Sequence, residues 1–327
     1  MVLYKLFCNL THEQKDIILK NPHTLHFFCY YENIQILDKN KNIPDNLIGF
    51  KYHRRINKEI QKNNINYDLI KNIYFQNTIN FKLDDNYPKL DYQDRNLRPT
   101  STLHVGQIKM FLVTLQFLTN YIPKNKETHI LYPGSAYGTN IYILSKLFPN
   151  CFWYLIDPNP YFKKLHDNNK ILYMSNRLFT NEDAKYFKKK LKNKFTLFIS
   201  DIRNDYNDHN WTVNEINIDK DMINQYNWCK IFNADFSLLK FRLSRLSEKK
   251  KYSYLDGEIF IQPFATVSTT ETRLVVKKNA KDKLYDTIDY ENKLYYHNRI
   301  LRVCNYSKLH NYKFKYLCNC FDCTSFF

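Results

Sequence analysis

The stretch Thr128-His129-Ile130-Leu131-Tyr132-Pro133-Gly134-Ser135-Ala136-Tyr137-Gly138-Thr139-Asn140 decides how the rest of the chain is interpreted. It begins with mostly apolar residues, as in a short buried strand, and continues into a turn of small residues. From Ile141 to Phe148, apolar residues recur at helical spacing. The chain has only 5 glycines, and two of them, Gly134 and Gly138, lie in this turn. A strand, a glycine turn and a helix in this order are typical of a nucleotide-binding α/β domain, in which the helix offers free N–H groups to a ligand.

A second apolar run, Cys151–Ile156, ends in the carboxylate of Asp157. An acid at the tip of the second strand, about twenty residues past the glycine turn, suits the diol of a ribose. NAD and S-adenosylmethionine both fit that geometry, but the turn lacks the pattern Gly-x-Gly-x-x-Gly, which disfavours NAD. It also lacks Gly-Lys-Ser/Thr, which excludes a P-loop. The spacing alone leaves open an ordinary strand-to-helix turn with a capping acid.

Further apolar runs and helical periodicities organise the chain into alternating elements. Strands are expected at 171–174, 195–200, 236–241, 258–264 and 272–276, and helices near 12–20 and 55–72 and at 105–118, 181–192, 212–231 and 283–303. This alternation predicts a doubly wound, Rossmann-like α/β sheet with helices on both faces and a hairpin-like end, whose ligands bind at the carboxyl edge of the strands. Residues 1–85 carry no recognisable motif and form an N-terminal extension to a main domain of residues 86–327.

The composition indicates a folded protein with an anionic partner. Of the 327 residues, 44% are hydrophobic and 17% aromatic, and 49 Lys and Arg against 32 Asp and Glu give a net charge of +17. Such a charge suits nucleic acid or a membrane surface, although codon bias toward lysine is an alternative source. No window approaches 18 apolar residues, so we expect no membrane span. The N-terminus lacks the layout of a signal peptide and the 8 cysteines are mostly scattered, which favours a cytoplasmic location.

The carboxyl-terminal cysteines form the one group that resembles a metal site. Cys318, Cys320 and Cys323, with His310 and Cys304 upstream, could bind zinc. Their spacing matches no standard zinc finger, so no metal is expected.

Two charged residues stand where an α/β sheet would place its chemistry. Asp201 ends the strand at 195–200, and Lys240 lies inside the apolar run at 236–241. A buried lysine costs free energy unless it is paired or its pKa falls. Alone, Lys240 could be an edge-strand lysine that reaches water, and Asp201 a helix cap. Together with Lys109 and Glu271, they predict a base of lowered pKa held by flanking acids.

Seven sequence blocks then occur in order over roughly residues 90–305: Gly106-Gln107-x-Lys109, Tyr132-x-Gly134-Ser135-Ala136-x-Gly138-Thr139, Leu155-Ile156-Asp157, Ile199-Ser200-Asp201-x-Arg203, Lys240, Gln262-Pro263-Phe264-Ala265 and Glu271-x-Arg273-Leu274. These blocks resemble the family of poxvirus cap-specific mRNA 2′-O-methyltransferases, which also serve as poly(A) polymerase stimulatory subunits. The wider relatives are FtsJ-like RNA 2′-O-methyltransferases.

By this resemblance, a Lys-Asp-Lys-Glu tetrad for methyl transfer corresponds to Lys109, Asp201, Lys240 and Glu271. The residues that would line an S-adenosylmethionine site are Gln107, Tyr132, Gly134, Gly138, Asp157, Phe179 through its backbone, and Asp201. Two positions depart from the family. Tyr137 replaces a proline of the loop, which changes its stiffness, and Asn159 replaces an arginine beside the cofactor, which removes a cation. Neither change removes a group that the chemistry requires.

The resemblance also implies a pocket for the cationic N7-methylguanine of an mRNA cap, which needs aromatic faces and a carboxylate. Tyr92 would provide one face, and Glu291 would accept the ring N–H groups. The family's second aromatic position is Arg245 here, and its cation would repel a cationic base. Either Phe241 or another nearby ring substitutes, or the cap is read less sharply. Alternatively, Tyr92 is a surface tyrosine and Glu291 a helix-terminal acid.

The implied function is transfer of a methyl group from S-adenosylmethionine to the ribose 2′-hydroxyl next to the cap of mRNA. A poly(A) polymerase catalytic subunit is an expected partner, and a viral factory or virion is the implied location. Two alternatives remain open. One is an RNA-binding stimulatory subunit without catalysis, and the other is a 2′-O-methyltransferase that acts on uncapped rRNA or tRNA and lacks a cap pocket.

Overall fold

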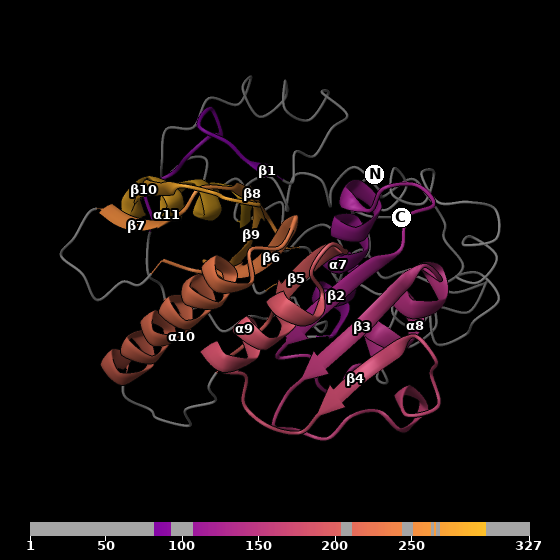
Figure 1. Cartoon of the computed structure of the whole chain (residues 1–327). Coiled ribbons are helices and arrows are strands. Elements are labelled where there is room, and N and C mark those ends of the chain that lie inside the picture. Colours follow the sequence, from indigo (N-terminus) through magenta and orange to yellow (C-terminus); the bar gives the residue numbers. More distant parts are fainter. Residues whose placement is uncertain are drawn as a thin grey trace, which may run out of the picture. The chain divides into compact units, whose positions relative to one another are not determined.

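The computed structural model describes residues 82–92, 107–203, 211–243, 251–262, 265 and 269–298 (Figure 1). The chain divides into two compact units. The first comprises Met1–Lys109, Pro263–Thr269 and Glu291–Phe327, and the second comprises Met110–Gln262 and Thr270–Tyr290. The helices expected near 12–20 and 55–72, Arg245 and the carboxyl-terminal cysteines lie outside the described residues. So does most of the predicted extension 1–85.

The second unit is built on a mostly parallel sheet. Its strands, in spatial order, are β8 (Glu258–Phe260), β9 (Thr272–Lys277), β6 (Phe236–Phe241), β5 (Phe195–Ser200), β2 (Thr128–Pro133), β3 (Cys151–Ile156) and β4 (Ile171–Ser175). The pairs from β6 to β4 are parallel, and β9 is antiparallel to both β6 and β8. All six residues of β2 are buried, as expected of a strand covered on both faces. The strands predicted from the sequence, including the antiparallel end, are confirmed, except that the strand expected at 258–264 ends at Phe260.

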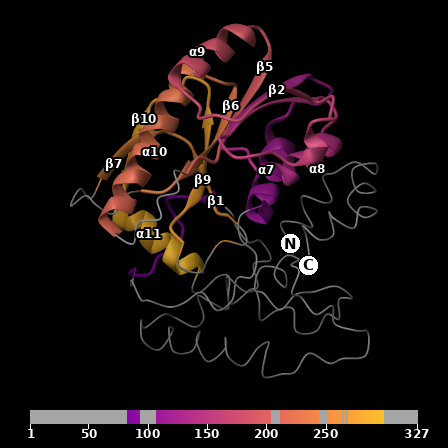
Figure 2. The same ribbon diagram turned by 90° about the horizontal axis from the view of Figure 1, so that it is seen from below.

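Helices cover both faces of this sheet, which confirms the doubly wound fold. Figure 2 shows α8 (Thr139–Leu147) on one face, with α9 (Asn181–Lys190) and α10 (Trp211–Phe232) on the other. The chain runs outward from β2 to β3 and β4, then returns to β5 on the opposite side of β2. This reversal creates a switch point at the carboxyl ends of β2 and β5, where α/β sheets bind ligands. The two ends meet directly, because the Asp201 N–H donates to the Pro133 carbonyl at 3.2 Å.

The helix predicted at 283–303 is wrong in its first part. Asp282–Asp286 forms strand β10, which pairs antiparallel with β7 (Lys251–Leu255), a strand that the sequence did not predict. The helix α11 (Thr287–Tyr296) begins only afterwards. Asp286 accepts a hydrogen bond from the Asp289 N–H at 2.9 Å, so its carboxylate caps the helix and sets this boundary. Leu294 and Tyr295 of this helix are buried.

The remaining helix and strand have the following bounds: α7 spans Gln107–Tyr121 and β1 spans Lys82–Leu83, with the short 3-10 helix η1 at Lys163–Leu165. Both α7 and α11 pass from one unit of the chain into the other. Within the described ranges, no helix has the length and apolar character needed to cross a membrane.

Candidate active site

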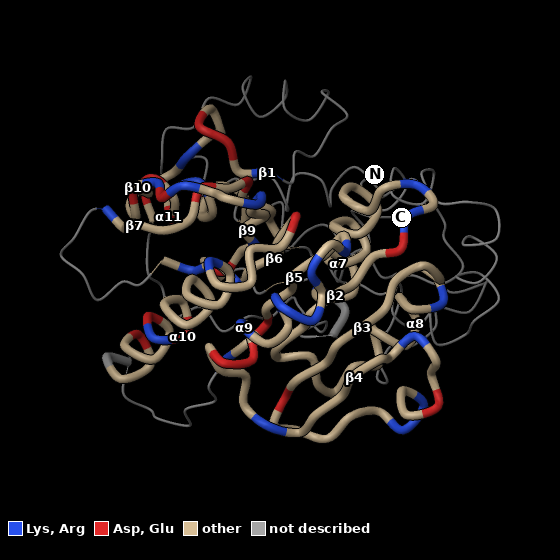
Figure 3. Tube along the Cα trace, viewed as in Figure 1, with Lys and Arg blue, Asp and Glu red and all other residues tan. Residues whose placement is uncertain are grey.

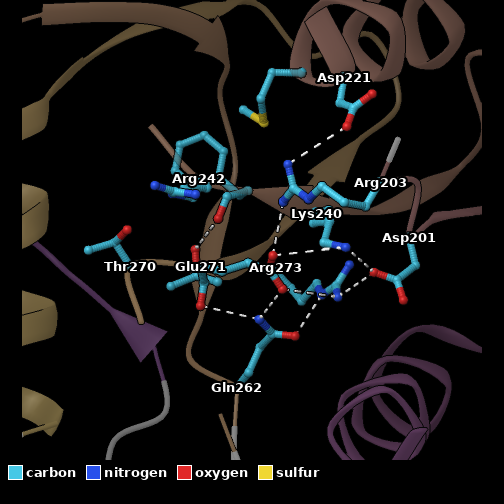
Figure 4. Close-up of polar contacts among 12 residues, drawn as sticks. Asp201, Arg203, Asp221, Lys240, Arg242, Gln262, Thr270, Glu271 and Arg273 are labelled. Carbon is cyan, nitrogen blue, oxygen red and sulfur yellow. Dashed lines mark hydrogen bonds and ion pairs between the residues drawn. The ribbon is translucent and has the colours of Figure 1, made fainter. Parts of the chain in front are cut away.

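Lys240 lies near the carboxyl end of β6, an interior strand between β5 and β9, with only 8% of its surface exposed. The interpretation of Lys240 as an edge-strand lysine is therefore wrong. Its ammonium nitrogen is 3.0 Å from Oδ1 of Asp201 and 3.9 Å from Oε2 of Glu271. Figure 4 shows the lysine between these two carboxylates. Three of the four residues predicted to act together are thus brought together within the second unit.

A fully buried arginine shares the carboxylates with the lysine. Arg273 is the register partner of Lys240 across the β6–β9 pair, so the two side chains leave the sheet on one face. Its guanidinium NH2 is 2.7 Å from Oδ1 of Asp201 and 3.7 Å from Oε1 of Glu271. Its Nε donates to the side chain of Gln262 at 2.9 Å. The arginine is therefore fixed by at least three groups before any ligand is considered.

A second guanidinium reaches the cluster from the loop after β5. The NH2 group of Arg203 donates to Oε2 of Glu271 at 2.9 Å. Its other terminal nitrogen lies 3.8 Å from Asp221, a buried acid of α10. On the opposite side of Glu271, the Gln262 amide donates to its carboxylate at 3.2 Å. Glu271 is therefore held on one side by Arg203, which stays positively charged at ordinary pH, and on the other by Gln262, which is neutral.

These contacts set the proton affinity of the lysine. Burial lowers the pKa of Lys240 below its ordinary value, and the positive charges of Arg273 and Arg203 lower it further. The negative charges of Asp201 and Glu271 oppose this shift but do not cancel it. Burial also acts to lower the pKa of Arg273, but the same two carboxylates outweigh it and hold that pKa above its ordinary value. The cluster therefore contains permanently charged arginines and one lysine that gives up its proton more readily than usual.

The backbone of Lys240 is held by a glutamine from α10. The pairing of β5 with β6 ends at Ser200 and Leu239, one residue before Lys240. Beyond that point the side-chain amide of Gln225 replaces the missing strand. It accepts from the Lys240 N–H at 3.0 Å and donates to the Lys240 carbonyl at 3.0 Å. Gln225 is 1% exposed, so these bonds form without competition from water.

The glycine turn lies directly beside Asp201. Gly134 has φ of +75°, and a Cβ at this position would lie 2.7 Å from the backbone of Asp201 and Ile202. Gly138 has φ of +82°, and a Cβ there would lie 2.6 Å from the side chain of Leu165. Both positions therefore require glycine, for conformation and for space. The turn and the charged cluster share the same carboxyl edge.

Asp157 is 6% exposed and holds the glycine turn. Its Oδ2 accepts from the Ala136 N–H at 3.0 Å, and its Oδ1 accepts from the backbone and side-chain nitrogens of Asn159 at 2.8 and 3.1 Å. A carboxylate oxygen can accept about two hydrogen bonds. Among the contacts of the described residues, Oδ2 therefore keeps one acceptor position, as a ribose hydroxyl would require.

Two aromatic residues predicted at the cofactor site are part of the core. Tyr132, the fifth residue of β2, is 2% exposed, and burial raises the pKa of its hydroxyl well above the ordinary value. Phe179, in the segment before α9, is 7% exposed, and its ring lies edge-on to Trp228 with centroids 4.9 Å apart. Gln107 is the first residue of α7, and its side chain lies outside the described part of the structure.

In the first unit, the two residues predicted to bind a cap lie close together. The Tyr92 N–H donates to the Asn292 side chain at 2.8 Å, and the Tyr92 ring meets Tyr295 edge-on at 5.4 Å. Tyr92 therefore packs against the turn of α11 that carries Glu291. Both residues are half-buried. Lys109, also half-buried, belongs to this unit as well, so its position relative to Lys240 stays a prediction.

The substitution of Phe241 for the second cap-stacking ring is wrong. Phe241 is fully buried among Tyr254, Tyr285 and Tyr290, with ring centroids 5.1 to 5.7 Å away. Its ring serves the core between β6 and the β7–β10 ribbon and has no open face for a base. Arg245, which occupies the family's aromatic position, lies outside the described residues.

Sequence reasoning did not assign roles to Arg203, Arg273, Gln262 or Gln225. Arg273 carries a signal that could have been used, because it interrupts the apolar run of β9 just as Lys240 interrupts β6. Its spacing of two from Glu271 also predicts a shared face on a strand. Gln225 carries no such signal, since it is one of many polar residues in a 22-residue helix.

Comparisons with known proteins identify a family for this chain. A family model described as poly A polymerase regulatory subunit matches residues 80–323. Two similar proteins are the cap-specific mRNA (nucleoside-2′-O-)-methyltransferases of Myxoma virus strains Lausanne and Uriarra. Each is 27% identical over 241 residues, which cover 68% of this chain and 68% of the relative. A solved structure of bluetongue virus VP4, described as a multifunctional RNA-capping production line, aligns with a TM-score of 0.43 and 16% identity over 64% of this chain. The chain covers 34% of that VP4 chain.

Proposed function

The chain belongs to the poly A polymerase regulatory subunit family, and from that premise we propose that it is a 2′-O-methyltransferase of capped mRNA. The observation that carries the proposal is the buried Lys240, held between Asp201 and Glu271 at the switch point of the sheet. The names of the Myxoma virus relatives support the same reaction. Asp201, Lys240 and Glu271 act in the transfer, together with Lys109.

The lysine supplies what a sugar hydroxyl lacks. A ribose hydroxyl is a poor nucleophile at neutral pH, so a neighbouring base has to accept or orient its proton as the oxygen takes up the methyl group. The neutral form of Lys240 can accept that proton at Nζ, because burial and the neighbouring guanidiniums lower its pKa. Asp201 then stabilises the ammonium that results, at a distance of 3.0 Å. Alignment of the two reacting groups contributes as well.

The carboxyl edge suits S-adenosylmethionine as the methyl donor. Asp157 retains an acceptor position for a ribose hydroxyl, and the turn carries no side chain at Gly134 and Gly138. By the family resemblance, Gln107, Tyr132, Asn159 and Asp201 belong to this proposed site, and the backbone of Phe179 would face the adenine. When bound, this cofactor supplies an electrophilic methyl group on a positively charged sulfur. Asn159 supplies no cation beside the cofactor, so we expect weaker cofactor binding than an arginine would give, with no loss of a group that the chemistry requires.

The family also implies a second role beside a poly(A) polymerase catalytic subunit. An RNA-binding stimulatory subunit without catalysis is the alternative that the family description favours. A protein with that role alone would have no need for a buried lysine of lowered pKa, which costs folding free energy. We therefore propose that catalysis and polymerase stimulation coexist in this chain.

The decisive experiment compares Lys240→Met with wild type in transfer of labelled methyl groups to short capped, N7-methylated capped and uncapped RNAs. Loss of a general base costs about a hundred- to ten-thousand-fold in rate, while cofactor affinity should remain. Lys220→Met is the matched control, because Lys220 is an exposed lysine of α10. Near wild-type turnover by Lys240→Met would refute the assignment of the base. Equal turnover on uncapped RNA would favour an rRNA or tRNA substrate.

A further inference from the structure

A row of aromatic rings lies on the face of the sheet that α9 covers, away from the charged cluster. Neighbouring centroids along the row are 5.0 Å (Tyr186 to Phe187), 5.5 Å (Phe187 to Tyr154), 5.9 Å (Tyr154 to His129) and 5.6 Å (His129 to Phe152). Tyr173 of β4 joins the row through Phe187 at 5.4 Å. The row runs from the outer surface of α9 to Tyr154 of β3, crosses to His129 of β2 and ends at Phe152, near the amino-terminal end of β3.

Lysines sit over both ends of this row. The Lys190 ammonium lies 5.5 Å from the ring of Tyr154, 5.7 Å from Tyr173 and 5.6 Å from Tyr186. At the other end, the Lys170 ammonium lies 4.9 Å above Phe152. We call the surface formed by Phe152, Lys170, Tyr173, Tyr186 and Lys190 the lysine–aromatic face.

The lysine–aromatic face is open and carries excess positive charge. Tyr186 is 53% exposed, while Phe152 and Tyr173 are half-buried. Among the nearby acids, Glu127 contacts Lys194 and His129, and Asp183 pairs with Arg177. Glu182 lies 3.9 Å from Lys185, and Asp167, three residues before Lys170, is exposed.

Within the described ranges, no carboxylate lies at ion-pair distance from Lys170, or from Lys188, Lys189 and Lys190 in the last turn of α9. Figure 3 shows basic residues gathered at the end of α9.

We propose that the lysine–aromatic face binds single-stranded RNA. Lysines neutralise phosphates, and exposed rings offer faces on which bases of any sequence stack. RNA uses both, and the net charge of +17 supplies the long-range attraction.

This track is separate from the methyl-transfer centre. Phe152 is the second residue of β3, whereas Asp157 follows its last residue, so the two ends are about 16 Å apart along the strand. A short capped RNA held at the carboxyl edge would not need the lysine–aromatic face. A longer RNA could engage both, which raises its affinity through effective concentration. The proposal goes beyond the methyl-transfer function and does not depend on it.

The test is a titration of uncapped, fluorescent single-stranded RNA at several salt concentrations, without a methyl donor. The double variant Lys170→Ala/Lys190→Ala should lower the slope of log affinity against log salt by about 1.4, because each single-strand phosphate contact contributes about 0.7. Tyr186→Ala should weaken binding by about tenfold with an unchanged slope, because it removes a stacking surface and no charge. The second test variant, Lys188→Ala/Lys189→Ala, removes two lysines that lie over no ring of the described residues, and it should also lower the slope. A lowered slope in this variant would show that the effect of Lys170→Ala/Lys190→Ala comes from lost charge and not from misfolding.

Lys220→Ala/Lys251→Ala is the matched control, because it removes the same charge from exposed positions on α10 and β7. Cofactor affinity and melting temperature report folding in every variant. A lowered slope in both test variants, with the control unchanged, supports the proposal. Equal losses in the control, or unchanged slopes in the test variants, overturn it. Retained RNA affinity with lost binding to a poly(A) polymerase catalytic subunit would assign the lysine–aromatic face to a protein instead.

Discussion

The amide of Gln225 should be as important for turnover as a group that touches the substrate. Gln225→Met keeps the length and apolar body of the side chain but removes both hydrogen bonds to the Lys240 backbone, each 3.0 Å long. An orphaned buried polar group costs about 1–3 kcal/mol, so two cost about 2–6 kcal/mol if the backbone stays in place. The backbone can avoid this cost only by moving toward water or another partner. We therefore expect Lys240 to shift, and a displacement of about 1 Å costs about a hundredfold in rate.

Steady-state kinetics with short capped RNA, together with calorimetry of the cofactor, would measure this effect. We expect kcat to fall about a hundredfold while cofactor affinity stays within a factor of about two. Since burial is the largest cause of the lowered pKa of Lys240, greater hydration should raise that pKa and move the ascending limb of the pH–rate profile to higher pH. Tyr226→Phe is the control, because it removes a hydrogen bond to Asp282 from the next residue of the same helix. A destabilised Gln225→Met with unchanged kcat and pH profile would refute the reasoning.

Three further predictions follow from the same geometry. Arg203→Gln removes a positive charge that lowers the pKa of Lys240, and it also removes a hydrogen bond that holds Glu271. The pKa of Lys240 should therefore rise, and with it the pH at which kcat is half-maximal. Lys109→Ala should act in the same direction, and an unmoved pH profile would contradict both predictions. Asp157→Ala should weaken S-adenosylmethionine binding by about 1.5–3 kcal/mol in calorimetry, and an unchanged affinity would remove the ribose assignment. Tyr92→Ala and Glu291→Ala should each reduce a modest preference for N7-methylated over unmethylated caps, measured as a ratio of kcat/KM, and equal ratios in wild type and variants would exclude a cap pocket there.

The fold could be predicted because its strands are buried on both faces and therefore appear as apolar runs. The glycine turn could also be predicted, since a side chain at Gly134 would collide with the backbone of Asp201 and one at Gly138 would press on the side chain of Leu165. The β7–β10 ribbon was missed because Leu284 is 63% exposed and Tyr285 is the one buried residue of β10, so this strand shows no alternation of apolar residues.

At the site, Lys240 and Asp201 stood out as charges at the ends or interiors of apolar strands. The roles of Gln225 and Arg203 depend instead on where α10 and the loop after β5 pack. No local pattern in the sequence specifies that packing.

The sharing of carboxylate oxygens explains how a buried lysine can lose its proton at little cost. In an isolated buried pair, deprotonation of the lysine would leave its acid uncompensated, at about 3–5 kcal/mol. Here the oxygen of Asp201 that faces Lys240 at 3.0 Å also accepts from Arg273 at 2.7 Å. The Glu271 oxygen 3.9 Å from the lysine accepts from Arg203 at 2.9 Å.

Both acids therefore keep a closer and permanent cation when Lys240 becomes neutral. Replacing either arginine by a neutral residue would remove a positive charge that lowers the pKa of Lys240, so the lysine would hold its proton more tightly. The arginines thus make the lysine available as a base, although neither needs to touch the reacting hydroxyl.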